Sequence, residues 1–528
     1  MSDYPPLIFI AVCSGEKKLV KQWAASGDLP NIARLLGTGY TVDTESLHGL
    51  YVGANWPSLQ TACHPGKNRV FSWEQLQPGT YNMYRCKASD QARRPPFWEK
   101  LSEAGKKICI FDIPHSGLSK NLNGLQTVEW GAHDAEYGFR ANSQQLHDEI
   151  IEKFGLHPIP GNSDADRSKD ELLSFCEDLQ QGAKLKGRFS RYFLEQQQPD
   201  FFAQVFTEAH CGGHLLWHLH DPNYQWHRGA RSPDEIDSLK LVYQAVDEGI
   251  GEMLQAAPAN ANIFLLFSHG MGPMHNPYFM TEEILLALGV AEEITDPEPT
   301  QNFRNRIDPV LTWAWQQIPS RIKKLLQPLR KNLRDWVVGD KTPPSRIDKA
   351  KSRVFSIDKN HAHAGLRINL VGREPEGKVM PGEEYQQLLD QLTVDFKLLI
   401  NQETGKALVE EIYRTDKLYD GPERAHLPDL LVSWRNDDLP RQIYSPKIGH
   451  LEKHYEYVRS GDHSPYGMFV LNGPGIPTGH LQRTVSILDI APTLCSMQGV
   501  ELLNVDGKSI AEVVGLVNAA SENRSLAT

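Results

Sequence analysis

The sequence lacks the features that direct a protein to a membrane, to export or to nucleic acid. No hydrophobic run approaches the length needed to cross a bilayer. The apolar stretch LIFIAV at residues 7–12 has no basic segment before it and no cleavage site after it, so it predicts a first strand and not a signal peptide. A formal net charge of −11 provides no global basic field, so we expect no nucleic-acid partner.

Cysteine is scarce and is not arranged in pairs. The seven cysteines form no CxxC motif, and their odd number and wide spacing are typical of reduced thiols. Because disulfides are rare in the cytosol, this pattern predicts a cytoplasmic protein. The seven positions are Cys13, Cys63, Cys86, Cys109, Cys176, Cys211 and Cys495.

Alternating strand and helix patterns predict the fold class. The chain has 528 residues, of which 40% are hydrophobic and 23% charged, an ordinary globular composition. Residues 97–107 form an amphipathic helix pattern and 107–114 a strand pattern, while 201–206 and 262–268 are the continuous apolar runs of central parallel strands. We therefore expect one α/β domain over residues 1–528, with a mostly parallel central sheet and helices on both faces.

Residues 300–353 differ from the rest of the chain. The part from 302 to 353 contains thirteen Lys and Arg residues against four Asp residues, interleaved with tryptophan and leucine. This pattern predicts a basic helical insertion packed on the core, because basic helical faces are common on soluble proteins. The alternative is a basic amphipathic surface on anionic lipid or another polyanion, which would give peripheral membrane contact through residues 302–350.

Histidines gather in four segments, and several of them follow predicted strands. His210 and His214 are four residues apart, which places them on one helix face where they can share a metal ion. A third histidine from a distant loop would complete an open catalytic site. Each histidine taken alone is more often structural, but ligands bind beyond the carboxyl ends of strands in open α/β sheets, so the joint placement favours a metal centre. The segments are EAHCGGHLLWH (208–218), SHGMGPMH (268–275), NHAHAG (360–365) and GDHSPYG (461–467).

Six stretches of the sequence resemble motifs of a known superfamily: NWPSLQTACHPGK (55–67), FWEKLSEAGKKICIFDIP (97–114), EAHCGGH (208–214), FSHGMGP (267–273), GDHSPYGMFVLNGPGI (461–476) and ILDIAPTLCSMQGV (487–500). The resemblance is to the alkaline phosphatase superfamily, and within it to a bacterial subgroup of the type I phosphodiesterase/nucleotide pyrophosphatase branch. The resemblance implies an alkaline-phosphatase-like fold. It also implies two metal ions, usually zinc, and a Thr or Ser nucleophile at a helix N-terminus that attacks phosphorus.

The resemblance assigns roles to four histidines. His210 matches a metal-binding Asp of the family, and His214 matches the metal-binding His one turn further on. His463 matches the late histidine ligand of the same metal. His269 matches the histidine of the family's Asp-His-Gly turn, so we expect it to be a ligand or a catalytic acid.

The remaining family positions depart from the pattern. The first strand runs into Cys13-Ser14-Gly15 instead of Asp-Gly, and Ser268 replaces the Asp before the HGM turn. Val52 stands at the nucleophile position, and no Ser or Thr occurs between Tyr51 and Trp56. The second metal site is therefore expected to be dismantled. Three neutral histidines plus water form a hydrolytic zinc arrangement, so we expect one zinc ion and attack by a metal-bound hydroxide.

Other polar residues are candidates for the site. Asn55 could donate to a substrate oxygen or could only cap a helix. Glu208 could be a ligand, a partner of a ligand or a general base, and the loop pair His133–Asp134 could supply another base. Arg367 could bind phosphate or form a structural ion pair. Two further histidines could line the pocket with it, His361 and His363.

The resemblance favours a metal-dependent hydrolase of a phosphoester, with a phosphodiester as the first choice. The substrate would be a small molecule or a lipid- or glycan-linked phosphoester. A second hypothesis is hydrolysis or transfer at another centre, a sulfate ester or a carbon–nitrogen bond, because function lives in the site and not in the fold. A third is an inactive metal-binding scaffold that recognises a phosphorylated or glycan-linked partner.

Overall fold

A computed structural model describes residues 4–87, 92–159, 167–224, 229–232, 234–295, 345–358 and 362–527 of the chain. Its centre is a ten-stranded sheet. In spatial order the strands are β20 (Gly479–His480), β2 (Tyr40–Glu45), β19 (Tyr466–Asn472), β9 (Asn262–Phe267), β1 (Leu7–Val12), β8 (Phe201–Phe206), β5 (Ile108–Phe111), β6 (Gly124–Val128) and β7 (Arg140–Ala141), and β21 (Val485–Ser486) also pairs with β2.

The middle of this sheet is parallel. Strands β9, β1, β8, β5 and β6 run in one direction, whereas β19 is antiparallel to β9 and β7 is antiparallel to β6. Every residue of β1, β8 and β9 is buried, as the apolar runs predicted.

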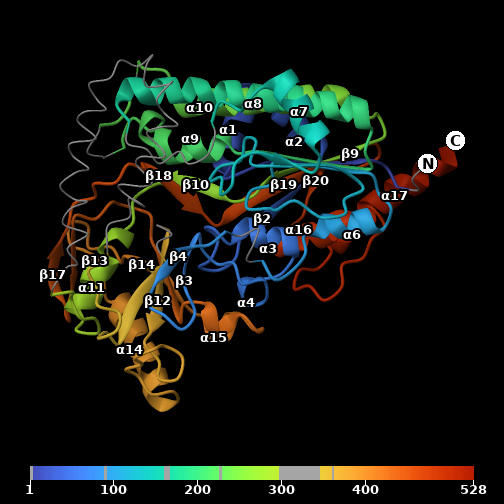
Figure 1. Cartoon of the computed structure of the whole chain (residues 1–528). Coiled ribbons are helices and arrows are strands. Elements are labelled where there is room, and N and C mark those ends of the chain that lie inside the picture. The colour runs from blue at the N-terminus through green and yellow to red at the C-terminus, as the bar shows by residue number, and fades with distance from the viewer. Residues whose placement is uncertain are drawn as a thin grey trace.

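Helices cover both faces of the sheet (Figure 1). On one face lie α1 (Lys17–Ala25), α2 (Pro30–Thr38), α7 (Gln144–Phe154), α8 (Lys169–Gln197), α9 (Glu208–Leu216) and α10 (Ser238–Ala256). On the other lie α3 (Asn55–Thr61), α6 (Phe97–Glu103) and α16 (Ile490–Ser496), with α17 (Ala511–Ala527) beside α16. The predicted α/β class, a mostly parallel sheet between two helical layers, is confirmed.

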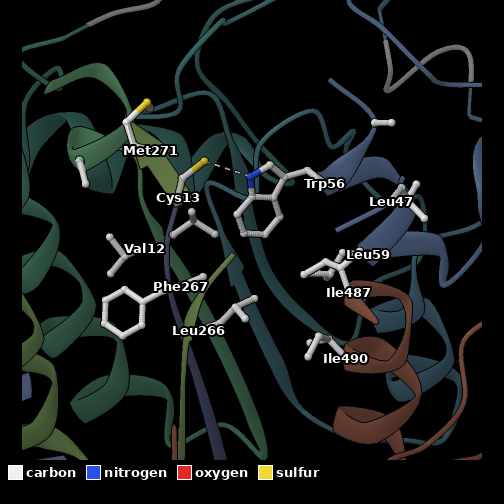
Figure 2. Close-up of a cluster of buried hydrophobic side chains, with 14 of the residues drawn as sticks. Val12, Cys13, Leu47, Trp56, Leu59, Leu266, Phe267, Met271, Ile487 and Ile490 are labelled. Atoms are coloured by element: carbon white, nitrogen blue, oxygen red, sulfur yellow. Dashed lines mark hydrogen bonds between the residues drawn. The ribbon is translucent and has the colours of Figure 1, made fainter. Parts of the chain in front are cut away.

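Buried side chains fix the carboxyl ends of the central strands. Val12 and Phe267 are fully buried at the ends of β1 and β9, and Trp56 from α3 lies against the end of β1 (Figure 2). Ile487 and Ile490 belong to the same buried cluster and lie beside α3 (Figure 2). The carboxyl ends of β1 and β9 are therefore held rigidly by packing.

Smaller sheets stand beside the central one. β11 (Val354–Asp358), β12 (His363–Ile368), β15 (Leu430–Trp434) and β14 (Val409–Arg414) form an antiparallel sheet in that order. A three-stranded sheet contains β13 (Ile400–Asn401), β16 (Gln442–Ser445) and β17 (Gly449–Glu452), and β3 (Glu74–Leu76) pairs with β4 (Met83–Arg85). β10 (Gly270–Pro273) pairs with β18 (Gly461–Ser464), next to the carboxyl end of the central sheet (Figure 1). The helices α4 (Pro65–Asn68), α11 (Thr281–Ala287), α14 (Glu383–Lys397) and α15 (Thr415–Leu418) connect these parts.

The predicted basic insertion, residues 300–353, lies outside the described residues up to position 344. Residues 345–353 contain no helix, and Ile347 forms a single bridge with Glu293. Among the helices in the described segments, none combines the length and the hydropathy that crossing a bilayer requires. Membrane contact through 302–350 stays a prediction.

Candidate metal centre

Three histidines meet at the carboxyl end of the central strands. His210 and His214 belong to α9, which follows β8 directly, and His463 belongs to β18. One ring nitrogen from each lies within 4.8 Å of the other two. The Nε2 atoms of His210 and His214 are 3.2 Å apart, and the His463 ring centroid is 4.6 Å from that of His214. The structure thus brings together the three residues predicted to bind the metal.

Two glycines allow α9 to approach β18 and β10 closely. A Cβ atom on Gly461 would lie 2.1 Å from the carbonyl oxygen of Gly213, and one on Gly213 would lie 2.7 Å from Met271 in β10. The Gly461 carbonyl in turn accepts a hydrogen bond from Nδ1 of His214, 2.9 Å away. Since a carbonyl only accepts, Nδ1 of His214 carries the proton and Nε2 keeps its lone pair for the cluster.

The donor set fits a divalent metal. Burial first, and then neighbouring positive groups, hold the pKa values of His210 and His463 well below the ordinary histidine range, so both imidazoles are neutral. Nitrogens that bind zinc at about 2.0–2.1 Å in a tetrahedral site lie about 3.4 Å apart. The observed 3.2 Å between the two Nε2 atoms is close to that spacing. Nδ1 of His210 is buried with no hydrogen-bond partner among the described residues.

A second set of polar groups adjoins His463. Nε2 of His269 lies 3.1 Å from Nδ1 of His463, and the Ser14 hydroxyl is 2.9 Å from the former and 3.1 Å from the latter. Nδ1 of His269 is 3.0 Å from the Asn55 amide nitrogen. Burial lowers the pKa of His269 to about 3, so its ring is neutral. His269 and Asn55 therefore lie at the edge of the cluster.

Asn55 does not cap its helix. The cap position of α3 is Ala54, and no side chain makes a capping hydrogen bond there. The side chain of Asn55 is instead turned to His269, and its Oδ1 atom is buried without a partner among the described residues. The alternative of a simple N-cap is therefore wrong, and substrate contact stays a prediction.

Glu208 is not part of the group formed by His210, His214 and His463. Its carboxylate lies 3.1 Å from both the Lys186 ammonium and Nε2 of His157, and all three side chains are buried. Although burial raises it, these two partners bring the pKa of Glu208 below its usual value. Lys186 also donates to the Gly131 carbonyl at 2.7 Å. These contacts are those of a buried ion pair, and they place the carboxylate outside the metal-binding group.

Arg367 is also engaged in structural contacts. Its guanidinium donates to Glu374 at 2.8 Å and to the carbonyls of Ala425 and Leu427 at 2.7 and 2.6 Å. Only 4% of the residue is exposed. The structure thus agrees with the ion-pair alternative for Arg367 and not with a phosphate-binding role.

We expect Arg367→Lys to lower the free energy of unfolding by about 1–3 kcal/mol, because lysine cannot reproduce the planar fork of donors. Inorganic phosphate should bind to the variant as tightly as to the wild type. Urea denaturation measures the first quantity and calorimetric titration the second. A large loss of phosphate affinity in a variant of unchanged stability would return Arg367 to the site.

Of the two histidines predicted to line the pocket, only His363 lies within the described residues. His363 is buried in β12, where its ring contacts Tyr51 with 5.6 Å between centroids. It is not part of the group formed by His210, His214 and His463. His361 lies outside the described residues.

Sequence patterns missed an arginine beside the cluster. Nη1 of Arg459 lies 3.4 Å from Nε2 of His214. Tyr455 donates its hydroxyl hydrogen to the Arg459 carbonyl at 2.9 Å, which anchors this backbone just before β18. The available signal was that Arg459 stands four residues before His463, but nothing in the local sequence distinguishes Arg459 from the many other arginines.

Residues 7–354 match the family described as type I phosphodiesterase/nucleotide pyrophosphatase. The chain belongs to this family. The predicted resemblance to this family is confirmed. His210, His214 and His269 lie within the matched span of this phosphodiesterase family member, whereas His463 lies beyond it. No curated protein sequence matches the chain.

Solved structures offer more distant likenesses. Phosphonoacetate hydrolase from Sinorhizobium meliloti 1021, in complex with phosphonoformate, is 12% identical with a TM-score of 0.47, covering 98% of this chain and 96% of that one. Human ectonucleotide pyrophosphatase/phosphodiesterase 5 is 11% identical with a TM-score of 0.48, covering 97% and 99%. An inactive variant of the murine protein in complex with AMP gives the same values.

Proposed function

We propose that this member of the family is a metal-dependent hydrolase of a phosphoester, with a phosphodiester as its first substrate class. The observation that carries the proposal is the group of three imidazoles, His210, His214 and His463, within 4.8 Å at the carboxyl end of the sheet. Neutral nitrogen ligands suit zinc, and one ion per chain is the expected content.

A divalent ion held by three neutral ligands would keep its full charge and supply Lewis acidity to a phosphoryl oxygen and to water. The other residues act on the substrate directly. Arg459 is a permanent cation beside His214 and is suited to hold a phosphoryl oxygen. Asn55 and His269 form the opposite edge, where His269 would donate a hydrogen bond to a substrate oxygen.

Arg459→Ala should weaken the binding of inorganic phosphate to the zinc-loaded protein about 10- to 100-fold, because a charge-assisted hydrogen bond is lost. Arg459→Lys, which keeps the charge but not the fork, should lose less. Titration calorimetry measures the affinity, and elemental analysis checks that zinc remains bound. Equal phosphate affinity in all three proteins would exclude Arg459 from the site.

A substrate panel tests the reaction. Zinc-loaded protein is expected to hydrolyse bis(p-nitrophenyl) phosphate, and removal of zinc by a chelator should abolish this until zinc is restored. Preferred hydrolysis of p-nitrophenyl sulfate or of an anilide would instead support action at another centre. Bound zinc without turnover of any of these esters would support the third hypothesis, a scaffold that recognises a phosphorylated or glycan-linked partner.

A cytoplasmic location is part of the proposal. All seven cysteines are buried thiols, which supports a reducing compartment. Whether the substrate is a free small molecule or is linked to lipid or glycan depends on the basic segment 302–350, and flotation of the full chain with anionic vesicles tests that part.

A further inference from the structure

A cysteine, a histidine and an aspartate form a connected chain beside the histidine cluster. The sulfur of Cys13 lies 3.4 Å from Nε2 of His133, and Nδ1 of His133 lies 2.8 Å from the carboxylate of Asp134. Trp56 donates its indole hydrogen to the same sulfur at 3.1 Å (Figure 2). These residues come from three separate parts of the chain, so the fold alone assembles them.

The hydrogen-bond partners define the role of each group. An ionised carboxylate only accepts, so Nδ1 of His133 donates to Asp134 and Nε2 is directed at the sulfur. A nucleophile within reach of a base that is oriented by a third group is the arrangement that activates thiols and hydroxyls. The Trp56 hydrogen bond adds a donor that favours negative charge on the sulfur.

The backbone delivers these groups to the metal cluster. Cys13 is the first residue after β1, and the next residue, Ser14, has a positive φ of 53°. Asp134 has the same φ value, and non-glycine residues in this region carry strain that is common at active sites. The His133 ring is stacked on the His210 ring with 3.9 Å between centroids, while the Ser14 hydroxyl contacts His463.

We propose that Cys13 is the nucleophile of this protein, with His133 as its acid–base partner and Asp134 as the group that orients His133. The proposal rests on the proposed phosphoester hydrolysis and supplies a nucleophile, because the stretch from Tyr51 to Trp56, where the resemblance implied a Thr or Ser nucleophile, contains neither. It differs from the attack by a water-derived nucleophile expected from the sequence, since water enters only in the second step.

Hydrolysis of the phosphoester would take two steps. The Cys13 sulfur forms a bond to phosphorus while the proton shared between sulfur and His133 is held on Nε2, and the bond from phosphorus to the leaving oxygen breaks. That oxygen takes the proton from Nε2 and departs as an alcohol. Water then gives a proton to Nε2 as its oxygen attacks phosphorus, the phosphorus–sulfur bond breaks, and the sulfur shares the proton with His133 again.

Access to the sulfur is the demanding requirement. Cys13 is fully buried, whereas the Asp134 side chain is 33% exposed and forms the open end of the chain of groups. A cysteine that merely fills space would react with thiol reagents as slowly as the other buried cysteines. The reactivity of Cys13 therefore separates a nucleophile from packing, whatever the substrate is.

The first experiment is alkylation of the full-length protein with iodoacetamide, followed by peptide mass mapping. Cys13 should be modified at least about tenfold faster than the other six cysteines, and Asp134→Asn should slow its modification about tenfold or more. Cys495→Ala, which removes an equally buried thiol with no histidine partner, should leave the Cys13 rate unchanged. Modification of Cys13 no faster than that of the others would overturn the proposal.

The second experiment uses bis(p-nitrophenyl) phosphate and zinc analysis. Cys13→Ala should lower kcat about 1,000-fold or more and keep its zinc, and acid quenching of the wild type should trap a phosphorylated peptide containing Cys13. Full turnover by Cys13→Ala, or loss of its zinc, would refute the nucleophile while leaving the hydrolase intact. A wild type that hydrolyses no phosphoester would remove the proposed function, and the alkylation result would still decide whether the thiol is activated.

Discussion

His214→Ala is expected to lose the bound zinc and to lower kcat/KM for a phosphodiester about 1,000-fold or more. The variant removes one of three ligands, and the remaining two cannot hold an ion at a defined position beside the substrate. Elemental analysis of the purified protein and steady-state kinetics with bis(p-nitrophenyl) phosphate measure the two effects. The loss of zinc and the loss of activity should both be large, because this donor group contains no carboxylate that could take the place of His214.

The matched control for this variant is His218→Ala. His218 lies one turn further along the same segment and is buried, but its Nδ1 atom bonds to the Ser460 hydroxyl at 2.9 Å and not to the cluster. Zinc should therefore stay bound in this variant. Retention of zinc in His214→Ala, or equal loss from both variants, would show that the ion is held elsewhere.

Lys186→Met is expected to lower the free energy of unfolding by about 3–5 kcal/mol, because it leaves the Glu208 carboxylate buried without its cation. The Lys186 side chain is fully buried and also donates to Val205 and Thr207 at 3.1 Å. Urea denaturation followed by circular dichroism measures the change. This is the largest stability effect that we expect from a single substitution near the site.

Two further variants separate the ion pair from catalysis. Lys184 lies on the same helix as Lys186 and forms an exposed ion pair with Glu248. Lys184→Met removes this pair and should change the free energy of unfolding little. Glu208→Gln should lower stability but keep zinc and most of the turnover per folded molecule. If Glu208→Gln were fully stable but inactive, the carboxylate would be a catalytic group, and the structural role of the Glu208–Lys186 ion pair would be refuted.

Local sequence patterns predicted the parts of the site that depend on periodicity. Strands β1, β8 and β9 were visible because buried parallel strands are continuously apolar, and His210 and His214 because four residues make about one helical turn. The same geometry explains Glu208. It stands two residues before His210, so it points to the opposite face of α9, where Lys186 lies.

Long-range pairing set the limit of prediction. His133 contacts Cys13 across 120 positions, and neither residue carries a local signal for the other. Arg367 and Arg459 look alike in sequence, yet one is enclosed by Glu374 while the other lies beside His214. Only the arrangement of strands and loops decides which arginine meets which partner.

The contact between α9 and β18 also joins two distant parts of the chain at the metal centre. His214 and the strand segment at Gly461 are 247 positions apart, and their hydrogen bond closes that long loop. An ion bound by His210, His214 and His463 would hold the two ends of this loop together. Its binding free energy would offset the entropy lost when so long a loop is closed. The chain from β18 onward would then be held in place by the same ion that serves the chemistry, so the metal-free protein should open first where β18 meets α9.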